Sequence, residues 1–120
     1  MKTGKHIPAA VLVALRREFA AGLPARIAIL REALDELERG ASTNAAQRLR
    51  LTAHSLAGTS ATLGATELTP HAERLESLGR DWQENGGRSP RDLAEARRAL
   101  EQLATAGHSV AARLQSGDAQ

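Results

Sequence analysis

Residues 51–65 read Leu-Thr-Ala-His-Ser-Leu-Ala-Gly-Thr-Ser-Ala-Thr-Leu-Gly-Ala, and this stretch sets one histidine, His54, among small and aliphatic residues. Its apolar positions recur every three or four residues, which predicts a helix with one buried stripe. The stripe consists of Leu49, Ala53, Leu56, Ser60 and Leu63. Because His54 lies off this stripe, we expect the core and the histidine to occupy different faces of the helix.

The helix face around His54 carries little bulk. Arg50 lies one turn before the histidine, and Ala57, Gly58 and Ala61 follow it by one and two turns. Glycine inside a helix costs about 1 kcal/mol relative to alanine, so Gly58 needs a reason. Two reasons are open at this point: close approach of another molecule to the imidazole, or tight packing within the protein.

Composition restricts the fold class and the compartment. The chain has 120 residues, 42% of them hydrophobic, which fits one domain with a single core. Aromatic residues make up only 2%, and alanine and leucine dominate, so an all-α fold is expected. We expect one domain over residues 1–120 with flexible ends at 1–6 and 116–120. The absence of cysteine excludes disulfides and thiolate sites, and a cytoplasmic location is the simplest expectation.

Charge and hydropathy argue against two classes of partner. The net charge is +2, but acidic and basic residues alternate along the chain, as on solvated helix faces. A nucleic-acid binder would need a basic stripe with aromatic residues, and the chain has only Phe19 and Trp82. No apolar run approaches the roughly 20 residues that cross a bilayer. We therefore expect neither nucleic-acid binding nor membrane insertion.

Turn signals divide the chain into helices. The first apolar pattern runs from Pro8 to Phe19, and a second over residues 27–37 ends at Gly40. Gly22 and Pro24 separate the two, so the region is either a short extra helix followed by another or one kinked helix. Residues 42–44 offer three N-cap candidates, Ser42, Thr43 and Asn44, for the His54 helix, which Gly64 ends.

The second half of the chain predicts two more helices. Thr69-Pro70 begins one that Asn85-Gly86-Gly87 closes, and Ser89-Pro90 begins another whose stripe reaches Leu114. Short connections favour antiparallel neighbours, so the His54 helix should form a hairpin with residues 69–85. The predicted fold is an antiparallel up-down four-helix bundle, with a short extra N-terminal helix or a kinked first helix.

Several chemistries of histidine lack the residues they need. Metal binding is not expected, because His6, His71 and His108 stand apart and no His-x-x-x-His pair occurs. Hydrolysis by a serine nucleophile would need a strained turn, and no glycine-rich loop for ATP phosphates is present. An exposed imidazole that accepts a phosphoryl group from a partner remains, with the partner supplying metal and charge stabilisation.

The residues around His54 resemble a known family. The stretch Ala53-His54-Ser55-Leu56-Ala57-Gly58-Thr59-Ser60, followed by Leu63-Gly64-Ala65, Leu68 and Leu75-Glu76, is similar to the histidine-containing phosphotransfer (HPt) domain of bacterial phosphorelays. The resemblance covers essentially the whole chain. It implies a four-helix bundle whose exposed histidine carries phosphoryl groups to and from the aspartate of response-regulator receiver domains.

The resemblance assigns expected roles to residues. His54 would be phosphorylated, Arg50 would support the phosphate, and the receiver would dock on a surface made of Leu51, Ala57, Gly58 and Ala61. The family usually has lysine where this chain has Ala57. Either Arg50 substitutes for that lysine, or transfer is slower or runs preferentially in one direction.

Partners and cofactors follow from the same expectation. The chain itself would bind no cofactor, because the receiver supplies Mg²⁺, and it would have no autokinase activity. Receivers, and potentially a hybrid histidine kinase, would be its partners, and we expect a monomer. The alternative is a non-catalytic helical adaptor that docks a receiver or kinase through the same face without transfer.

Overall fold

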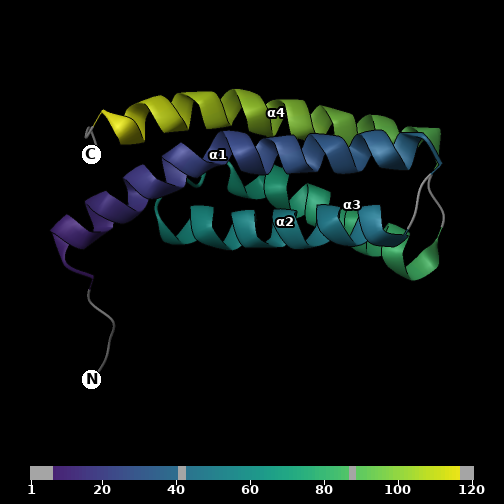
Figure 1. Cartoon of the computed structure of the whole chain (residues 1–120), viewed down its shortest axis with the longest axis horizontal. Coiled ribbons are helices and arrows are strands. Elements are labelled where there is room, and N and C mark those ends of the chain that lie inside the picture. Colours follow the sequence, from purple (N-terminus) through teal and green to yellow (C-terminus); the bar gives the residue numbers. More distant parts are fainter. Residues whose placement is uncertain (1–6, 41–42, 87–88, 117–120) are drawn as a thin grey trace, which may run out of the picture.

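The computed structural model describes residues 7–40, 43–86 and 89–116, and in these ranges the chain forms four helices and no strand. Figure 1 shows them as long rods that lie along one axis. They are α1 (Ala9–Glu38), α2 (Thr43–Thr62), α3 (Thr69–Asn85) and α4 (Pro90–Gln115). The predicted all-α four-helix bundle is confirmed.

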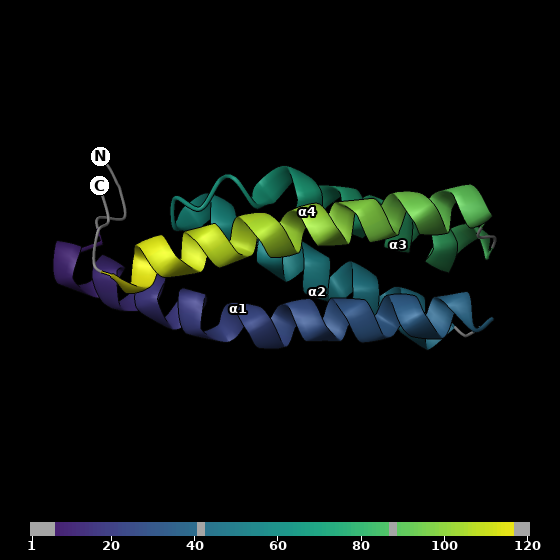
Figure 2. The same cartoon turned by 90° about the horizontal axis from the view of Figure 1, so that it is seen from above.

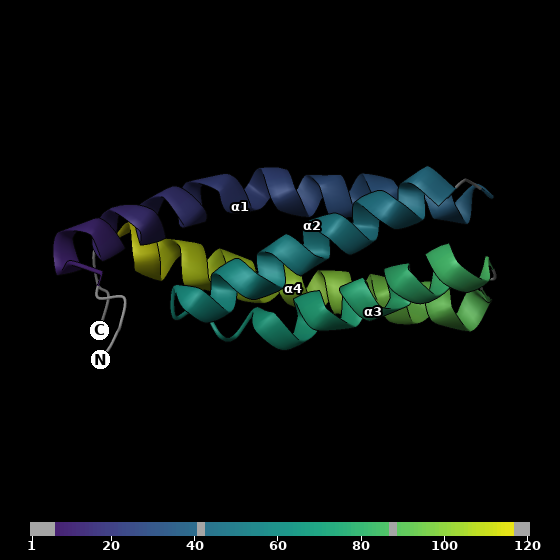
Figure 3. The same ribbon diagram turned by 90° about the horizontal axis from the view of Figure 1, so that it is seen from below.

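The helices form a closed ring of neighbours. α2 packs against α3 and α1, while α4 packs against α1 and α3. Within the described ranges the backbones of the two diagonal pairs, α1 with α3 and α2 with α4, do not approach each other closely. Figures 2 and 3 show α4 and α2 on opposite sides of the bundle, each lying between α1 and α3. The predicted hairpin of the His54 helix with residues 69–85 is therefore present as α2 and α3.

α1 decides between the two alternatives left open by the sequence. It runs without a break from Ala9 to Glu38 and carries Pro24 in its interior. Proline removes one helical hydrogen bond and bends a helix. Figure 1 shows the N-terminal part of α1 inclined to the rest. Gly22 and Pro24 thus mark a kinked first helix, and no separate short helix precedes it in the described residues.

The predicted helix ends agree with the structure in most places. Gly40, Gly64 and Gly86 have positive φ angles within two residues of the ends of α1, α2 and α3. The Ser89 side chain accepts a hydrogen bond from the backbone N–H of Asp92 (3.1 Å), so it caps α4 as expected. α2 begins at Thr43, whereas the other candidate Ser42 and the turn residue Gly87 lie outside the described residues.

The predicted start signal Thr69-Pro70 is confirmed, because α3 begins at Thr69. The N-cap position is Leu68, which has no side chain able to cap. The Thr69 hydroxyl lies 2.8 Å from the Ser60 hydroxyl, which in turn donates to the carbonyl of Ala57. The threonine therefore fixes the start of α3 against α2 and does not cap its own helix.

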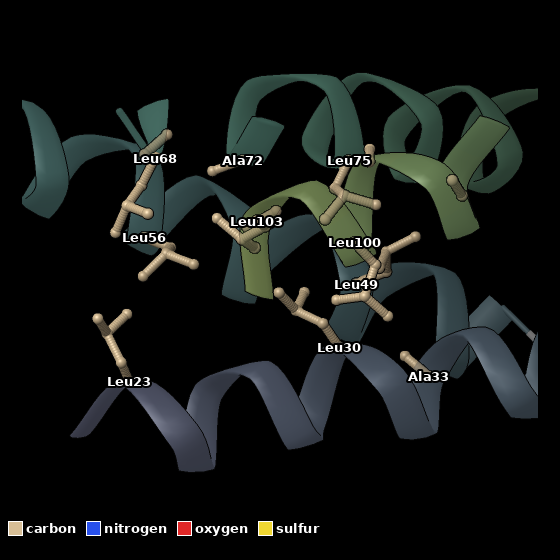
Figure 4. Packing of buried hydrophobic residues seen from close by; sticks show 14 of the residues in the cluster. Leu23, Leu30, Ala33, Leu49, Leu56, Leu68, Ala72, Leu75, Leu100 and Leu103 are labelled. Atoms are coloured by element: carbon tan, nitrogen blue, oxygen red, sulfur yellow. The ribbon is translucent and has the colours of Figure 1, made fainter. Parts of the chain in front are cut away.

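A core of aliphatic side chains holds the four helices together. Figure 4 shows leucines from every helix pointing toward one another. The predicted α2 stripe is buried at all its positions, and Trp82 is also buried. The largest fully buried side chains are Leu23, Leu30, Leu34, Leu37, Leu49, Leu56, Leu68, Leu75, Leu100, Leu103 and Val110. Burying a leucine side chain contributes about 1.5–3 kcal/mol, so these contacts fix the helix faces that remain outside.

Ion pairs at the bundle surface match the interleaved charges of the sequence. Arg97 of α4 donates to both carboxylate oxygens of Glu38 on α1 (2.7 and 3.1 Å) and also to Asp35. These hydrogen bonds lower the pKa of both carboxyl groups. None of the helices in the described ranges combines the length and apolar character that crossing a bilayer requires.

Candidate functional site

His54 lies on the exposed side of α2, facing the edge of α3. Its side chain is 70% exposed, whereas Ala53 and Leu56 of the same helix are fully buried. The Nδ1 atom of His54 lies 2.8 Å from Oε2 of Glu76 on α3, whose side chain is only 13% exposed. The core and the histidine thus occupy different faces of α2, as the sequence predicts.

The contact with Glu76 determines which imidazole nitrogen carries the proton. An ionised carboxylate can only accept hydrogen bonds. Glu76 Oε2 also accepts a hydrogen bond from Nη2 of Arg80, one turn later on α3 (2.8 Å). In neutral His54 the proton must therefore be on Nδ1, and the lone pair is on Nε2. The site presents an exposed imidazole whose Nε2 is free to act as a nucleophile.

The α2–α3 turn sets the register that brings Glu76 to His54. Gly64 has φ of +80°, and the N–H of Ala65 donates to the carbonyl of Ser60 (2.8 Å), which ends α2 tightly. Arg16 of α1 donates through Nε to the carbonyl of Leu63 at the same helix end (2.9 Å). Because this connection is fixed, the antiparallel packing of α2 and α3 places His54 opposite Glu76, about two helical turns away from the connection.

Arg50, the predicted phosphate-supporting residue, is held beside α3. Its Nε donates to Oε1 of Gln83 (2.6 Å), and its side chain is part-buried. Gly79 allows the approach, because a Cβ atom there would lie 3.0 Å from the Arg50 backbone nitrogen and 3.1 Å from its Cα. Arg50 is therefore on the α3 side of the histidine face, and its role toward a phosphate remains a prediction.

We expect Gly79→Ala to lower the free energy of unfolding by about 1–3 kcal/mol, because the added methyl meets backbone atoms that cannot move without separating α2 from α3. Thermal and urea denaturation measure the change. Gly22→Ala in α1 is the matched control, since its Cβ meets no atom within 4 Å. That substitution should raise stability by about 0.5–1 kcal/mol. Equal stabilisation by both changes would contradict the packing role of Gly79.

Gly58 is exposed on α2 and has no packing neighbour among the described residues. A Cβ atom added to it would meet nothing within 4 Å. Packing within the described part of the protein therefore does not require glycine at this position. Of the two reasons left open by the sequence, packing within the described residues is thereby removed, and close approach of another molecule remains a prediction. Ala61 is also exposed, and Leu51 is 48% exposed on the same helix.

Ala57 was expected on the docking surface, and this is wrong. Only 7% of it is exposed, and it belongs to the core. The reason is the helix geometry: each residue advances by about 100°, so the third residue after His54 falls about 60° short of a full turn. That rotation carries Ala57 toward the core, whereas Gly58 falls about 40° beyond a full turn and stays outside.

A shallow hollow of about 500 Å³ surrounds the histidine. Residues of α2, including Ser55 and Gly58, form most of it, and Leu15 of α1 closes one side. Leu15 is 37% exposed, although its spacing in the sequence is that of a core position. Among the described residues no cluster of three or more His, Asp or Glu side chains could hold a metal ion.

The sequence model of the family described as Hpt domain matches residues 14–114. The chain belongs to the Hpt family. As an Hpt domain it has a phosphotransfer role in two-component signalling, and its partners are receiver domains of response regulators. Neither the curated proteins nor the solved structures compared with the chain include a match.

Proposed function

We propose that His54 accepts a phosphoryl group from the aspartate of one receiver and passes it to the aspartate of another in a two-component phosphorelay. The observation that carries this proposal is the 2.8 Å contact between His54 Nδ1 and Glu76 on an imidazole that is 70% exposed. In the neutral imidazole this contact puts the proton on Nδ1 and leaves the lone pair on Nε2, which is the form a phosphoryl acceptor needs.

The transfer step is a displacement at phosphorus. The Nε2 lone pair of His54 forms the N–P bond while the bond between phosphorus and the aspartyl oxygen breaks, and the aspartate leaves as a carboxylate. Nδ1 keeps its proton throughout, so the ring gains positive charge as the bond forms. The Glu76 carboxylate, already hydrogen-bonded to Nδ1, stabilises that charge. The receiver supplies Mg²⁺ and the charge stabilisation at the phosphoryl oxygens.

A cation on this chain would add to that stabilisation of the phosphoryl oxygens. Arg50 is our candidate, because it lies one turn before His54 and already faces the α3 side of the site. Receiver docking is assigned to the exposed residues Leu51, Gly58 and Ala61. Ala57 is withdrawn from that surface because it is buried.

One observation keeps the adaptor alternative in view. Position 57 has no cationic side chain, although the resemblance places a lysine there. A chain that docks receivers through the α2 surface without accepting phosphate would also leave this face open. The two functions differ in whether His54 becomes labelled.

We expect wild-type protein incubated with a ³²P-phosphorylated receiver to acquire label that is acid-labile and base-stable, and we expect His54→Ala to acquire none. Label that persists in His54→Ala would place the acceptor elsewhere. His54→Gln provides the second arm, because it keeps a polar side chain of similar size. If wild-type protein binds receivers, acquires no label from any of them and binds equally well as His54→Gln, the chain is an adaptor.

A further inference from the structure

A second groove lies beside the His54 hollow, between α1 and α2. Arg26 and Ile29 of α1 and Leu51, Thr52 and Ser55 of α2 line it, and its volume is about 290 Å³. Ser55 also lines the hollow that contains His54, so the two depressions adjoin at this residue. A receiver docked over His54 and Leu51 therefore covers this groove too.

Arg26 is an arginine with an unpaired buried nitrogen. Its Nη1 is inaccessible to solvent and has no hydrogen-bond partner within the described ranges. Its guanidinium carbon lies 5.9 Å from the centroid of the Phe19 ring, which orients the group. The positions one turn away on α1 are Gly22, Leu23, Ile29 and Leu30, and none of them offers a carboxylate.

Other arginines of the bundle surface show what is missing at Arg26. Arg31, Arg80 and Arg97 each donate to a carboxylate on their own or a neighbouring helix. Nη1 itself is out of reach of a ligand, but the half-buried Arg26 side chain lines the groove without a carboxylate of the described residues beside it. A docked protein that covers this side chain removes water from a charged group, so a carboxylate that pairs with the guanidinium at the groove gains affinity. The planar guanidinium fork favours a carboxylate, which can accept two parallel hydrogen bonds.

The walls of the groove favour a protein side chain over a free anion. Ile29 is 40% exposed and Leu51 is 48% exposed, and both are large apolar residues beside the guanidinium. A docked protein would cover this apolar rim and exclude water, which strengthens a charge pair inside it. A small anion such as inorganic phosphate would leave the rim exposed.

We propose that this groove receives an aspartate or glutamate side chain of the docked receiver and that Arg26 binds its carboxylate. This inference rests on the proposed function, because the receiver must dock over His54. Arg26 thereby becomes a specificity-determining residue: a receiver without an acid at the matching position covers the guanidinium without pairing with it, and it docks more weakly.

The test uses a phosphorylated receiver that transfers to the wild-type protein. We expect Arg26→Gln to raise the KM for that receiver by about tenfold, the size of a lost charged hydrogen bond, with the rate at saturation changed less than twofold. Arg17→Gln is the control, because Arg17 is an exposed arginine of the same helix, about half a turn of rotation away from Arg26. Its KM should equal that of the wild type.

Alanine substitutions at each acidic residue on the receiver's docking face identify the partner group. One of them should raise the KM of the wild-type protein by about tenfold and have no further effect on Arg26→Gln. An unchanged KM for Arg26→Gln, or effects that add for every acid, overturns the inference while the proposed function stands. Absence of transfer from every receiver to the wild-type protein overturns the proposed function itself.

Discussion

We expect the Gly58→Glu variant to accept no measurable phosphoryl group from a receiver while keeping its four-helix fold. Gly58 lies one turn after His54 on the exposed side of α2. A Cβ atom added to it would have no neighbouring atom within 4 Å in the described structure. A glutamate there projects into the space that a receiver must enter. It also places a negative charge beside a partner site that handles a negatively charged phosphoryl group.

The measurement compares transfer from a receiver with labelling by phosphoramidate, a small phosphoryl donor that needs no docking surface. Gly58→Glu should lose the first by at least about 100-fold and keep the second, because the imidazole itself is unchanged. Ala112→Glu is the matched control: it adds the same side chain at an exposed position of α4, whose backbone does not approach that of α2 closely in the described ranges. Normal receiver transfer by Gly58→Glu would contradict docking over this glycine.

The smaller change Gly58→Ala separates function from stability. Alanine fits without contact, so the free energy of unfolding should rise by about 1 kcal/mol through helix propensity alone. We expect transfer from the receiver to slow nonetheless, because the added methyl projects from α2 toward the receiver and keeps it farther from His54. A residue that costs stability and is not needed for packing is consistent with selection for close approach.

The sequence predicted the bundle because its helix periods, caps and stripes agree with one another. The stripe from Leu49 to Leu63 is buried as expected, and the off-stripe position of His54 follows from the same spacing. The sequence does not determine whether Pro24 kinks the first helix or ends it. Whether a proline kinks or ends a helix depends on the packing on both sides of it, and here Leu23 and Leu30 are both buried in one core.

The candidate site was predicted in part. His54, Gly58 and Leu51 are exposed as expected, whereas Ala57 is buried because a three-residue step turns inward on this helix. In the sequence, Glu76 stands out only as part of the family resemblance. Its contact with His54 depends on the register of α2 against α3, which the pair Ser60 and Thr69 sets near the turn. Counting residues outward from Gly64 along both helices could have suggested it.

Arg26 could not have been singled out from the sequence. Arginine on an amphipathic helix ordinarily extends into solvent, and nothing in the local pattern marks this one as different. Its place in the groove between α1 and α2 depends on tertiary packing. The position of Leu15 also depends on tertiary packing: its spacing on α1 is that of a core residue, but its side chain lines the hollow around His54. Both residues lie on α1, so the proposed docking surface would extend beyond the helix that carries His54.

Glu76→Ala should slow phosphoryl uptake by about 100-fold or more from a receiver and from phosphoramidate alike. Removing the carboxylate releases Nδ1, so the proton can move to Nε2 and block the nucleophilic lone pair. It also removes the group that stabilises positive charge on the ring as the N–P bond forms. In a catalytic triad, the loss of the carboxylate that fixes the histidine tautomer lowers the rate by about 10⁴-fold, so the expected loss is large.

Two variants and one spectrum distinguish this role from a structural one. Glu76→Gln keeps an acceptor oxygen at the same reach, so its rate should lie between those of the wild type and Glu76→Ala. Glu73→Ala removes an exposed acid from the same helix and should transfer normally. Nitrogen-15 NMR of the neutral imidazole should show the proton on Nδ1 in the wild type and mostly on Nε2 in Glu76→Ala. A wild-type spectrum with the proton on Nε2 would show that Glu76 does not hold the tautomer, and the assignment of Nε2 as nucleophile would fail with it.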